Sequence, residues 1–213
     1  MWSSDGKQVK VSDKVVSFSW QQVVTAFWRR YPNPYSKHVL TEDVVDRKVI
    51  LSKDGPLLRS VRLLTKTNSI PKWGEKLVPS AQRTVSIIEE SLVDPVRKIL
   101  KTKTRNIGLT KVMYVEETVV YTMQEKHRCL IDRRATVKSD LLGLATALQT
   151  FGAERFKHNA SKANKGLEYV LNKLYTNESL HVLTPKELLK QTAAEKAQKA
   201  KEKVQRAVAS NTS

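Results

Sequence analysis

Residues 29–39, RRYPNPYSKHV, combine side chains that could hold an anion. Two arginines precede a Pro-Asn-Pro turn that tyrosines flank, and a histidine follows. An arginine can bind phosphate or carboxylate oxygens through two parallel hydrogen bonds, and prolines restrict the backbone beside it. The stretch therefore predicts either a basic, rigid corner that holds an anion or simply the end of a helix.

No catalytic constellation is recognisable in the rest of the sequence. The histidines lie far apart, at positions 38, 127, 158 and 181. A nucleophile elbow, a P-loop and a dinucleotide-binding glycine pattern are absent from the sequence. Cys129, the single cysteine, has no identifiable base as a partner, and Glu116 and Glu117 should face opposite sides of one strand. The sequence thus predicts no enzyme, no disulfide within the chain and no metal site.

The residues before the basic corner predict a helix. Ser19 can cap its start, because Gln22 follows three residues later as in a capping box. Apolar side chains then recur at helical spacing, at positions 20, 23, 24, 27 and 31. Pro32 ends this helix, since the residue before a proline disfavours helical geometry. Residues 7–18, which are rich in valine, are expected to form a first strand.

A different periodicity begins after the corner. Six segments rich in Val, Ile, Leu and Thr read as strands, at residues 38–51, 57–67, 83–94, 96–107, 110–123 and 128–138. KDGP at 53–56 and DP at 94–95 predict hairpin turns between neighbouring segments. With residues 7–18, the segments predict an antiparallel sheet of about seven strands.

One connection in this region is long. Residues 68–82, NSIPKWGEKLVPSAQ, contain two prolines, a glycine and an isolated Trp73. A loop of this length inside a compact domain often acts as a lid over a functional site.

The C-terminal third of the chain returns to helical spacing. Residues 141–174 predict a long helix in which Gly152 and Gly166 allow close packing. Residues 184–209 form an Ala/Lys/Glu-rich segment that favours a helical tail. Together the elements predict an α+β fold in which the long helix covers one face of the sheet. If the sheet curls around that helix, a cavity can lie between them.

The charge of the chain points to an anionic partner. The 213 residues carry a formal charge of +17, and 40% of them are hydrophobic, which suits one globular domain with a core. Nucleic acid, an acidic membrane surface and an anionic small molecule all remain possible partners. Nucleic-acid binding is the weaker alternative, because aromatic residues are only 7% and no RNA-recognition or zinc-finger pattern is present.

Three stretches of the sequence carry a resemblance to a known family. They are AFWRRYPNPYSKHVLTEDVVDRKV at 26–49, RLLTKTNSIPKW at 62–73 and SLVDP at 91–95. Over about residues 1–174 the chain resembles the PRELI family of mitochondrial lipid-transfer proteins. The Lys/Ala-rich tail at 184–209 is similar to the late-embryogenesis-abundant-like extension of the animal PRELI branch, rather than to the slowmo-type branch.

This resemblance implies a fold and a function. The fold would be a curved seven-stranded antiparallel sheet closed by a long C-terminal helix around a lipid cavity, related to START-type carriers. The protein would reside in the mitochondrial intermembrane space, bound to a small helical partner with twin Cys-x9-Cys motifs. It would carry phosphatidic acid between the outer and inner membranes for cardiolipin synthesis, with phosphatidylserine as the alternative cargo. No cofactor other than the phospholipid cargo is implied.

The resemblance also implies site residues. The headgroup-binding positions of the family fall on Arg30, His38, Arg62, Lys66, Arg155 and Lys162. Pro71 and Trp73 fall in the loop that would act as a lid and contact the membrane. The spacing agrees with these roles, because alternate residues of a strand share a face and residues seven apart in a helix lie two turns apart on one face. The headgroup pocket is expected to be entirely basic.

Overall fold

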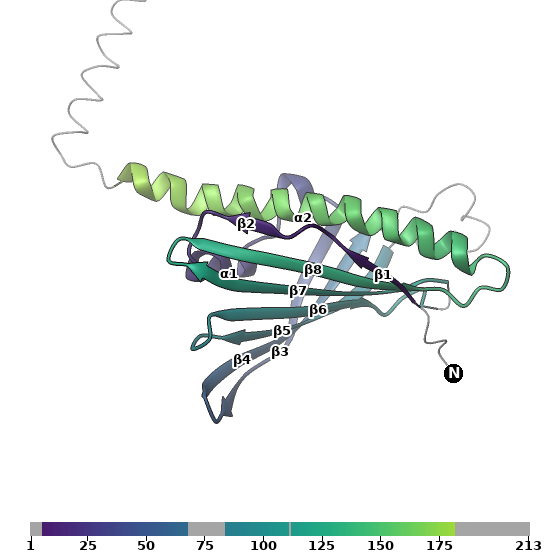
Figure 1. Cartoon of the computed structure of the whole chain (residues 1–213), viewed down its shortest axis with the longest axis horizontal. Coiled ribbons are helices and arrows are strands. Elements are labelled where there is room, and N and C mark those ends of the chain that lie inside the picture. The colour runs from purple at the N-terminus through teal and green to yellow at the C-terminus, as the bar shows by residue number, and fades with distance from the viewer. Residues whose placement is uncertain (1–5, 68–83, 111, 182–213) are drawn as a thin grey trace, which may run out of the picture. The chain divides into compact units, whose positions relative to one another are not determined.

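The computed structural model describes residues 6–67, 84–110 and 112–181. In this part of the chain the strands form one antiparallel sheet, along which a long helix lies (Figure 1). The strand order is β1-β8-β7-β6-β5-β4-β3, and β2 also pairs with β8. The strands are β1 Lys7–Lys10, β2 Lys14–Val16, β3 Val39–Ser52, β4 Gly55–Thr67, β5 Thr84–Asp94, β6 Ile99–Asn106, β7 Tyr114–Glu125 and β8 Arg128–Lys138. The helices are α1 Trp20–Trp28, α2 Ala145–His181 and a short 3₁₀ helix, η1, at Pro34–Ser36.

The predicted architecture is confirmed, with one correction to the first strand. The sheet is antiparallel, curved and open, and every strand expected between residues 38 and 138 is present with its ends shifted by a few residues. The single strand expected for residues 7–18 is wrong, because this segment forms β1 and β2. Lys10 pairs with Arg134 and Lys14 with Ile131, so three intervening residues face two of β8. The extra residue interrupts the ladder and divides the strand.

Helix α1 starts with the capping box that the sequence predicts. The Ser19 hydroxyl accepts a hydrogen bond from the Gln22 amide at 3.3 Å, and the Gln22 side chain accepts one from the Ser19 amide at 2.9 Å. The helix buries Trp20, Val23 and Phe27 among its residues, and it ends at Trp28 rather than at the expected Tyr31.

The corner after α1 is held by a buried asparagine. The Asn33 carboxamide accepts a hydrogen bond from the Tyr35 amide at 2.9 Å and donates one to the Arg30 carbonyl at 2.6 Å. The Asn33 side chain thus fixes the backbone on both sides of the turn. This arrangement sets the position of Arg30 relative to η1 and the start of β3.

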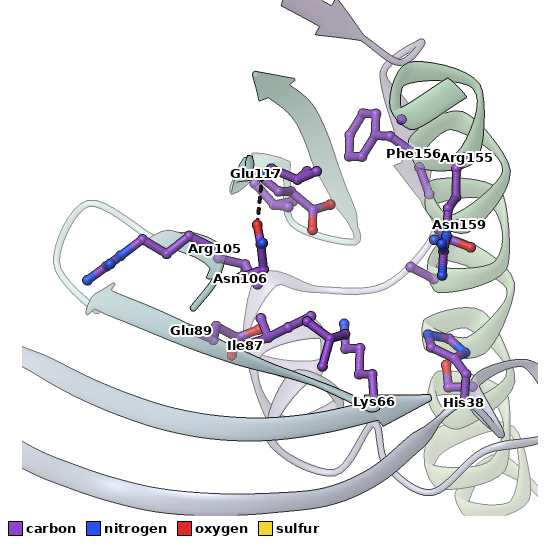
Figure 2. A pocket seen from close by; sticks show the side chains of 18 of the residues that line it. His38, Lys66, Ile87, Glu89, Arg105, Asn106, Glu117, Arg155, Phe156 and Asn159 are labelled. Atoms are coloured by element: carbon purple, nitrogen blue, oxygen red, sulfur yellow. Dashed lines mark hydrogen bonds between the residues drawn. The ribbon is translucent and has the colours of Figure 1, made fainter. Parts of the chain in front are cut away.

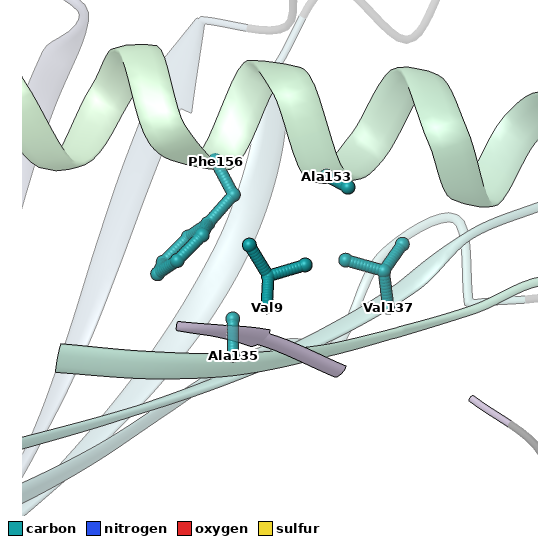
Figure 3. Close-up of a cluster of buried hydrophobic side chains, with 5 residues drawn as sticks. All are labelled: Val9, Ala135, Val137, Ala153 and Phe156. Carbon is teal, nitrogen blue, oxygen red and sulfur yellow. The ribbon is translucent and has the colours of Figure 1, made fainter. Parts of the chain in front are cut away.

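Helix α2 packs on the sheet through small and aromatic side chains. Figure 3 shows the cluster that joins them, which consists of Val9, Ala135, Val137, Ala153 and Phe156. We refer to the sheet face that carries Ala135 and Val137 as the inner face. Apolar burial of this kind contributes about 25 cal/mol per Å² and holds the helix against the strands.

Two glycines of α2 allow this close approach, as the sequence predicts. A Cβ on Gly152 would lie 2.6 Å from the Met113 sulfur, and one on Gly166 would lie 2.8 Å from the Asn33 side-chain oxygen. Both distances are shorter than van der Waals contact, so a larger residue at either position would force the neighbouring side chain or α2 to shift.

The chain divides into two compact units, residues 1–171 and 172–213. The structure describes residues 172–181 of the second unit, as the last part of α2. The expected lipid-transfer domain at 1–174 and helical tail at 184–209 stay predictions, since the tail lies outside the described residues. Pro71 and Trp73 also lie outside them. Among the described residues, no helix is long and apolar enough to cross a membrane.

Candidate functional site

A cavity of about 280 Å³ lies between the inner face of the sheet, α1 and α2 within the first unit. Strands β4 to β8 each contribute residues to its wall. The wall is largely apolar, with Phe27, Val85, Ile87, Val115, Val119, Leu148, Phe151, Phe156 and Leu167 among its residues. The volume lies just below the range of about 300–1,000 Å³ that is typical of ligand pockets.

Cationic and polar groups gather at one part of this wall. Figure 2 shows Lys66 on its strand and His38 beside it, with Arg155 and Asn159 projecting from α2. The His38 carbonyl accepts a hydrogen bond from the Thr67 amide at 2.8 Å, which fixes the histidine beside the end of β4. In the part of the chain that the structure describes, Lys66 forms no ion pair with a carboxylate. We call Lys66, His38, Arg155 and Asn159 the cationic wall.

His38 is neutral at pH 7 in this environment. Burial, together with the positive charges of Lys66, Lys162 and Arg155, lowers its pKa to about 4. Burial also lowers the pKa of Arg155. Burial is the larger cause of the lowered pKa of His38, and the three neighbouring positive charges add to it; the same charges would attract an anion placed beside the ring.

A second group of charged side chains consists of arginines and glutamates that pair with one another. Arg62 is only 1% exposed, and its guanidinium donates to Glu89 at 3.0 Å and to Glu42 at 2.6 Å. Arg30 donates to the same Glu89 and, at 3.0 Å, to the Phe27 carbonyl. Burial alone would raise the pKa of Glu89, but Arg30 and Arg62 outweigh it and lower the pKa. Glu89 is therefore ionised and acts as the shared counterion of both arginines.

Arg133 and Glu117 form a third charged element on the inner face. Their side chains make a short ion pair on β8 and β7, and both line the cavity. The Arg133 Nε is buried and has no hydrogen-bond partner among the described residues. Together with the ion pairs of Arg30 and Arg62, this pair brings the total to three arginines and three glutamates. These six side chains carry no net charge. The excess positive charge of the cavity comes from the cationic wall.

The structure divides the six predicted headgroup residues into three classes. Arg30, His38, Lys66 and Arg155 line the cavity. Arg62 lies on the same sheet face as Lys66 but behind the cavity wall, paired with carboxylates. Lys162 is exposed and does not line the cavity, although its charge reaches His38. The expectation of an entirely basic pocket is wrong, because Glu89 and Glu117 belong to its wall.

Sequence reasoning missed Glu89, Glu117, Arg133 and Asn159. The sequence did contain a signal for the three charged residues. Each occupies a position in its strand at which the alternate residues on either side are mostly apolar and face inward. Arg133, for example, follows Cys129 and Ile131 and precedes Ala135 on one strand face. A charge at such an inward position indicates either a buried ion pair or a site. Arg105 is the opposite case: it contributes to the cavity wall, but its side chain points away from the other residues (Figure 2), on the face of its cross-strand partner Glu116.

Solved structures share this fold at low sequence identity. TTHA0849 from Thermus thermophilus is 15% identical, with a TM-score of 0.55 over 79% of this chain and 99% of its own. The Zhui aromatase/cyclase from Streptomyces sp. R1128 is 9% identical, with a TM-score of 0.53 over 80% of this chain and 96% of its own. These structures place the chain among START/Bet v1-like folds.

Relatives with higher identity cover most of the chain. The PRELI domain-containing protein 1, mitochondrial, of Homo sapiens is 46% identical over 195 residues, which are 90% of this chain and 85% of the relative. The protein of the same name from Bos taurus has the same identity and coverage. Protein UPS1, mitochondrial, of Saccharomyces cerevisiae is 36% identical over 154 residues, 71% of this chain and 86% of its own. The model of the PRELI-like family matches residues 21–178, and the chain therefore belongs to this family.

Proposed function

We propose that the chain carries phosphatidic acid between the outer and inner mitochondrial membranes and thereby supports cardiolipin synthesis. Membership of the PRELI family supports lipid transfer, and the names of the relatives support a mitochondrial location. The observation that carries the proposal is an apolar cavity with a cationic wall between the sheet and α2. The intermembrane space is the compartment that this route requires.

Hydrocarbon chains need such a cavity. Two acyl tails contain roughly 30 methylenes, and exposing them to water costs about 0.8 kcal/mol each, or about 25 kcal/mol in total. A groove open to solvent could not offset this free energy, whereas a closed apolar interior can. Because 280 Å³ is small for two tails, we expect α2 and the sheet to separate further when the lipid enters.

The cationic wall suits a phosphate. A phosphomonoester carries between one and two negative charges near neutral pH. Lys66 supplies an ammonium, Arg155 supplies planar donors, and Asn159 supplies an amide. His38 can donate through its neutral ring and take up a proton once the phosphate lies beside it. Lys162 would add charge from the exposed side of α2.

Arg30 and Arg62 have a different proposed role. Their charges are balanced by Glu89 and Glu42, so they contribute little net attraction for an anion. We propose that they hold the corner after α1 in place beside the headgroup. The lid role of Pro71 and Trp73 and the small helical partner with twin Cys-x9-Cys motifs are further parts of the proposal, which rest on the family resemblance.

Phosphatidylserine is the second candidate cargo. Its ammonium group requires an acceptor, and Glu117 offers one, because its carboxylate lines the cavity and its side chain is partly exposed there. Its pairing with Arg133 weakens this candidate, since the ammonium would have to compete with an existing ion pair. Nucleic-acid binding through the basic surface is the remaining alternative and predicts steeply salt-dependent association.

A competition assay tests these cargoes. Donor vesicles contain labelled phosphatidic acid and phosphatidylserine in equal amounts, and transfer to acceptor vesicles is measured with and without the helical partner. We expect faster transfer of phosphatidic acid. Preferred transfer of phosphatidylserine would replace the proposed cargo, and absence of any transfer together with DNA or RNA binding would contradict lipid carriage.

A further inference from the structure

The connection between β8 and α2 places a leucine almost entirely in solvent. Leu142 is 98% exposed, and Leu144 beside it is partly exposed. Ile107, in the connection between β6 and β7, is exposed as well. The Ser139 hydroxyl donates to the Val112 carbonyl at 2.7 Å, which ties the two connections together. We call Leu142, Leu144 and Ile107 the apolar tip.

The apolar tip is continuous with the cavity. The connection that exposes Ile107 also contributes Gly108, Leu109 and Val112 to the cavity wall. Leu148, one turn after Leu144 in the chain, lines the cavity from α2 and donates its amide to the Leu144 carbonyl at 2.9 Å. Apolar side chains therefore extend from solvent to the interior at this end of the molecule.

Charges beside the apolar tip are mainly positive. Lys7 and Lys138 lie on the paired ends of β1 and β8, from which the connection departs, and Asp140 is the one acidic residue within it. The Lys7 ammonium donates to the Thr150 hydroxyl in the first turns of α2 at 3.2 Å, so it is held near the tip. Protruding apolar residues with cations around them match an anionic bilayer surface, where the apolar groups enter and the cations meet the headgroups.

We propose that the apolar tip inserts into the surface of an anionic bilayer and places the cavity against it for lipid exchange. The proposal deepens the lipid-transfer function and rests on it for its purpose, but the insertion itself can be measured independently. A projecting turn fits between lipid headgroups, whereas it offers little area to a protein partner, whose interface normally buries several hundred Å² on each side.

The test compares two variants, in each of which a different exposed leucine is replaced by glutamate. Leu142→Glu changes the apolar tip, and Leu51→Glu changes a leucine that is 85% exposed on β3, near the hairpin at the other end of the sheet (Figure 1). Flotation with phosphatidylcholine vesicles containing phosphatidic acid measures binding. We expect Leu142→Glu to weaken binding by about tenfold or more, and Leu51→Glu to bind like the unchanged protein. Equal binding by the two variants would overturn the proposal.

A fluorescence measurement locates the inserted residue. Leu142→Cys and Leu51→Cys variants are labelled with a fluorophore that brightens in hydrocarbon, and the native Cys129 does not compete because it is completely buried. We expect vesicles to brighten the label at position 142 only. Brightening at 142 without any lipid transfer would contradict the cargo and support insertion. Lipid transfer with the label at 142 still in water would contradict insertion and leave the cargo supported.

Discussion

The Arg62 Nε donates to the Glu89 carboxylate at 3.0 Å, and both side chains are almost fully buried, Glu89 in the cavity wall and Arg62 behind it. Glu89 also pairs with Arg30, and Arg62 also pairs with Glu42, so the ion pairs join the corner after α1 to β3, β4 and β5. The Phe27 ring lies under both guanidinium groups, 4.0 Å from Arg30 and 4.8 Å from Arg62. This network supports one side of the cavity wall, and in our proposal the phosphate binds to Lys66, His38 and Arg155 instead.

Removing one member of the buried network should destabilise the fold. Arg62→Gln leaves the negative charges of Glu89 and Glu42 only partly balanced in a buried site. Removing one partner of a buried ion pair typically lowers the free energy of unfolding by about 3–5 kcal/mol. Urea denaturation measures the free energy of unfolding. Arg97→Gln, which changes an exposed arginine paired with Asp54, is the matched control and should have a far smaller effect. If Arg62→Gln abolishes lipid transfer at unchanged stability, Arg62 binds the headgroup directly.

Lys66 should contribute to cargo binding with little effect on stability. Lys66→Gln removes one charged hydrogen-bond donor to the phosphate, a loss of about 1.5–3 kcal/mol, which corresponds to roughly ten- to hundredfold in affinity. Phosphatidic acid transfer between vesicles measures the effect. Lys103→Gln changes a strand lysine on the opposite sheet face, paired with Glu116 at 3.0 Å, and serves as the control. An equal effect of the two substitutions would indicate that only the overall charge matters.

The protonation of His38 should report cargo binding. Its pKa is about 4 in the empty cavity, because burial, Lys66, Lys162 and Arg155 all disfavour the charged ring. A phosphate beside the ring favours the charged form, so loading should raise this pKa toward or above the ordinary value of about 6.5. NMR titration of the imidazole, assigned with His38→Gln, measures both states. An unchanged pKa after loading would show that the phosphate binds elsewhere.

The same lowered pKa makes the stability of the empty protein depend on pH. The unfolded chain binds the His38 proton near pH 6.5, whereas the folded chain binds it only near pH 4. The contribution of His38 to the free energy of unfolding is therefore complete above about pH 6.5 and is lost as the pH falls from 6.5 to 4. We expect His38→Gln to flatten the slope of stability against pH within this window, as measured by denaturation at several pH values. An identical slope in the variant would contradict the lowered pKa.

Cys129 should be unreactive while the protein is folded. Burial raises the pKa of its thiol to about 12, against a weaker lowering by a hydrogen bond with the Thr122 backbone. The thiolate is the reactive form, so a maleimide should label the native protein very slowly and the unfolded protein rapidly. Mass spectrometry follows the labelling. Rapid labelling under native conditions would show that β8 opens locally.

Local sequence patterns predicted much of the fold. Ser19 and Gln22 mark the start of α1 because a capping box involves only neighbouring residues. Strand parity also placed Arg62 and Lys66 on one face and separated Glu116 from Glu117, since side chains alternate in any strand. The division of residues 7–18 into two strands could not be predicted, because it depends on the register against β8.

The charge balance of the site could not be predicted in the same way. Glu89 lies 27 residues from Arg62 in the sequence, and their pairing results from the register of β4 and β5. Four of the predicted headgroup residues line the cavity, but the counterions of Arg30 and Arg62 became visible only in three dimensions. Local pattern therefore identifies which residues face inward, whereas long-range pairing decides which of those charges can attract a ligand.

The central claim is that a phospholipid occupies the cavity between α2 and the sheet, and a variant that fills this space tests it most directly. Ala163 lines the cavity from α2, and Ala163→Phe places a ring in it. Native mass spectrometry after incubation with phosphatidic acid vesicles measures bound lipid, with circular dichroism as the control for folding. We predict one phospholipid on the unchanged chain and none on the folded Ala163→Phe variant. Equal amounts of lipid on both proteins would contradict the claim.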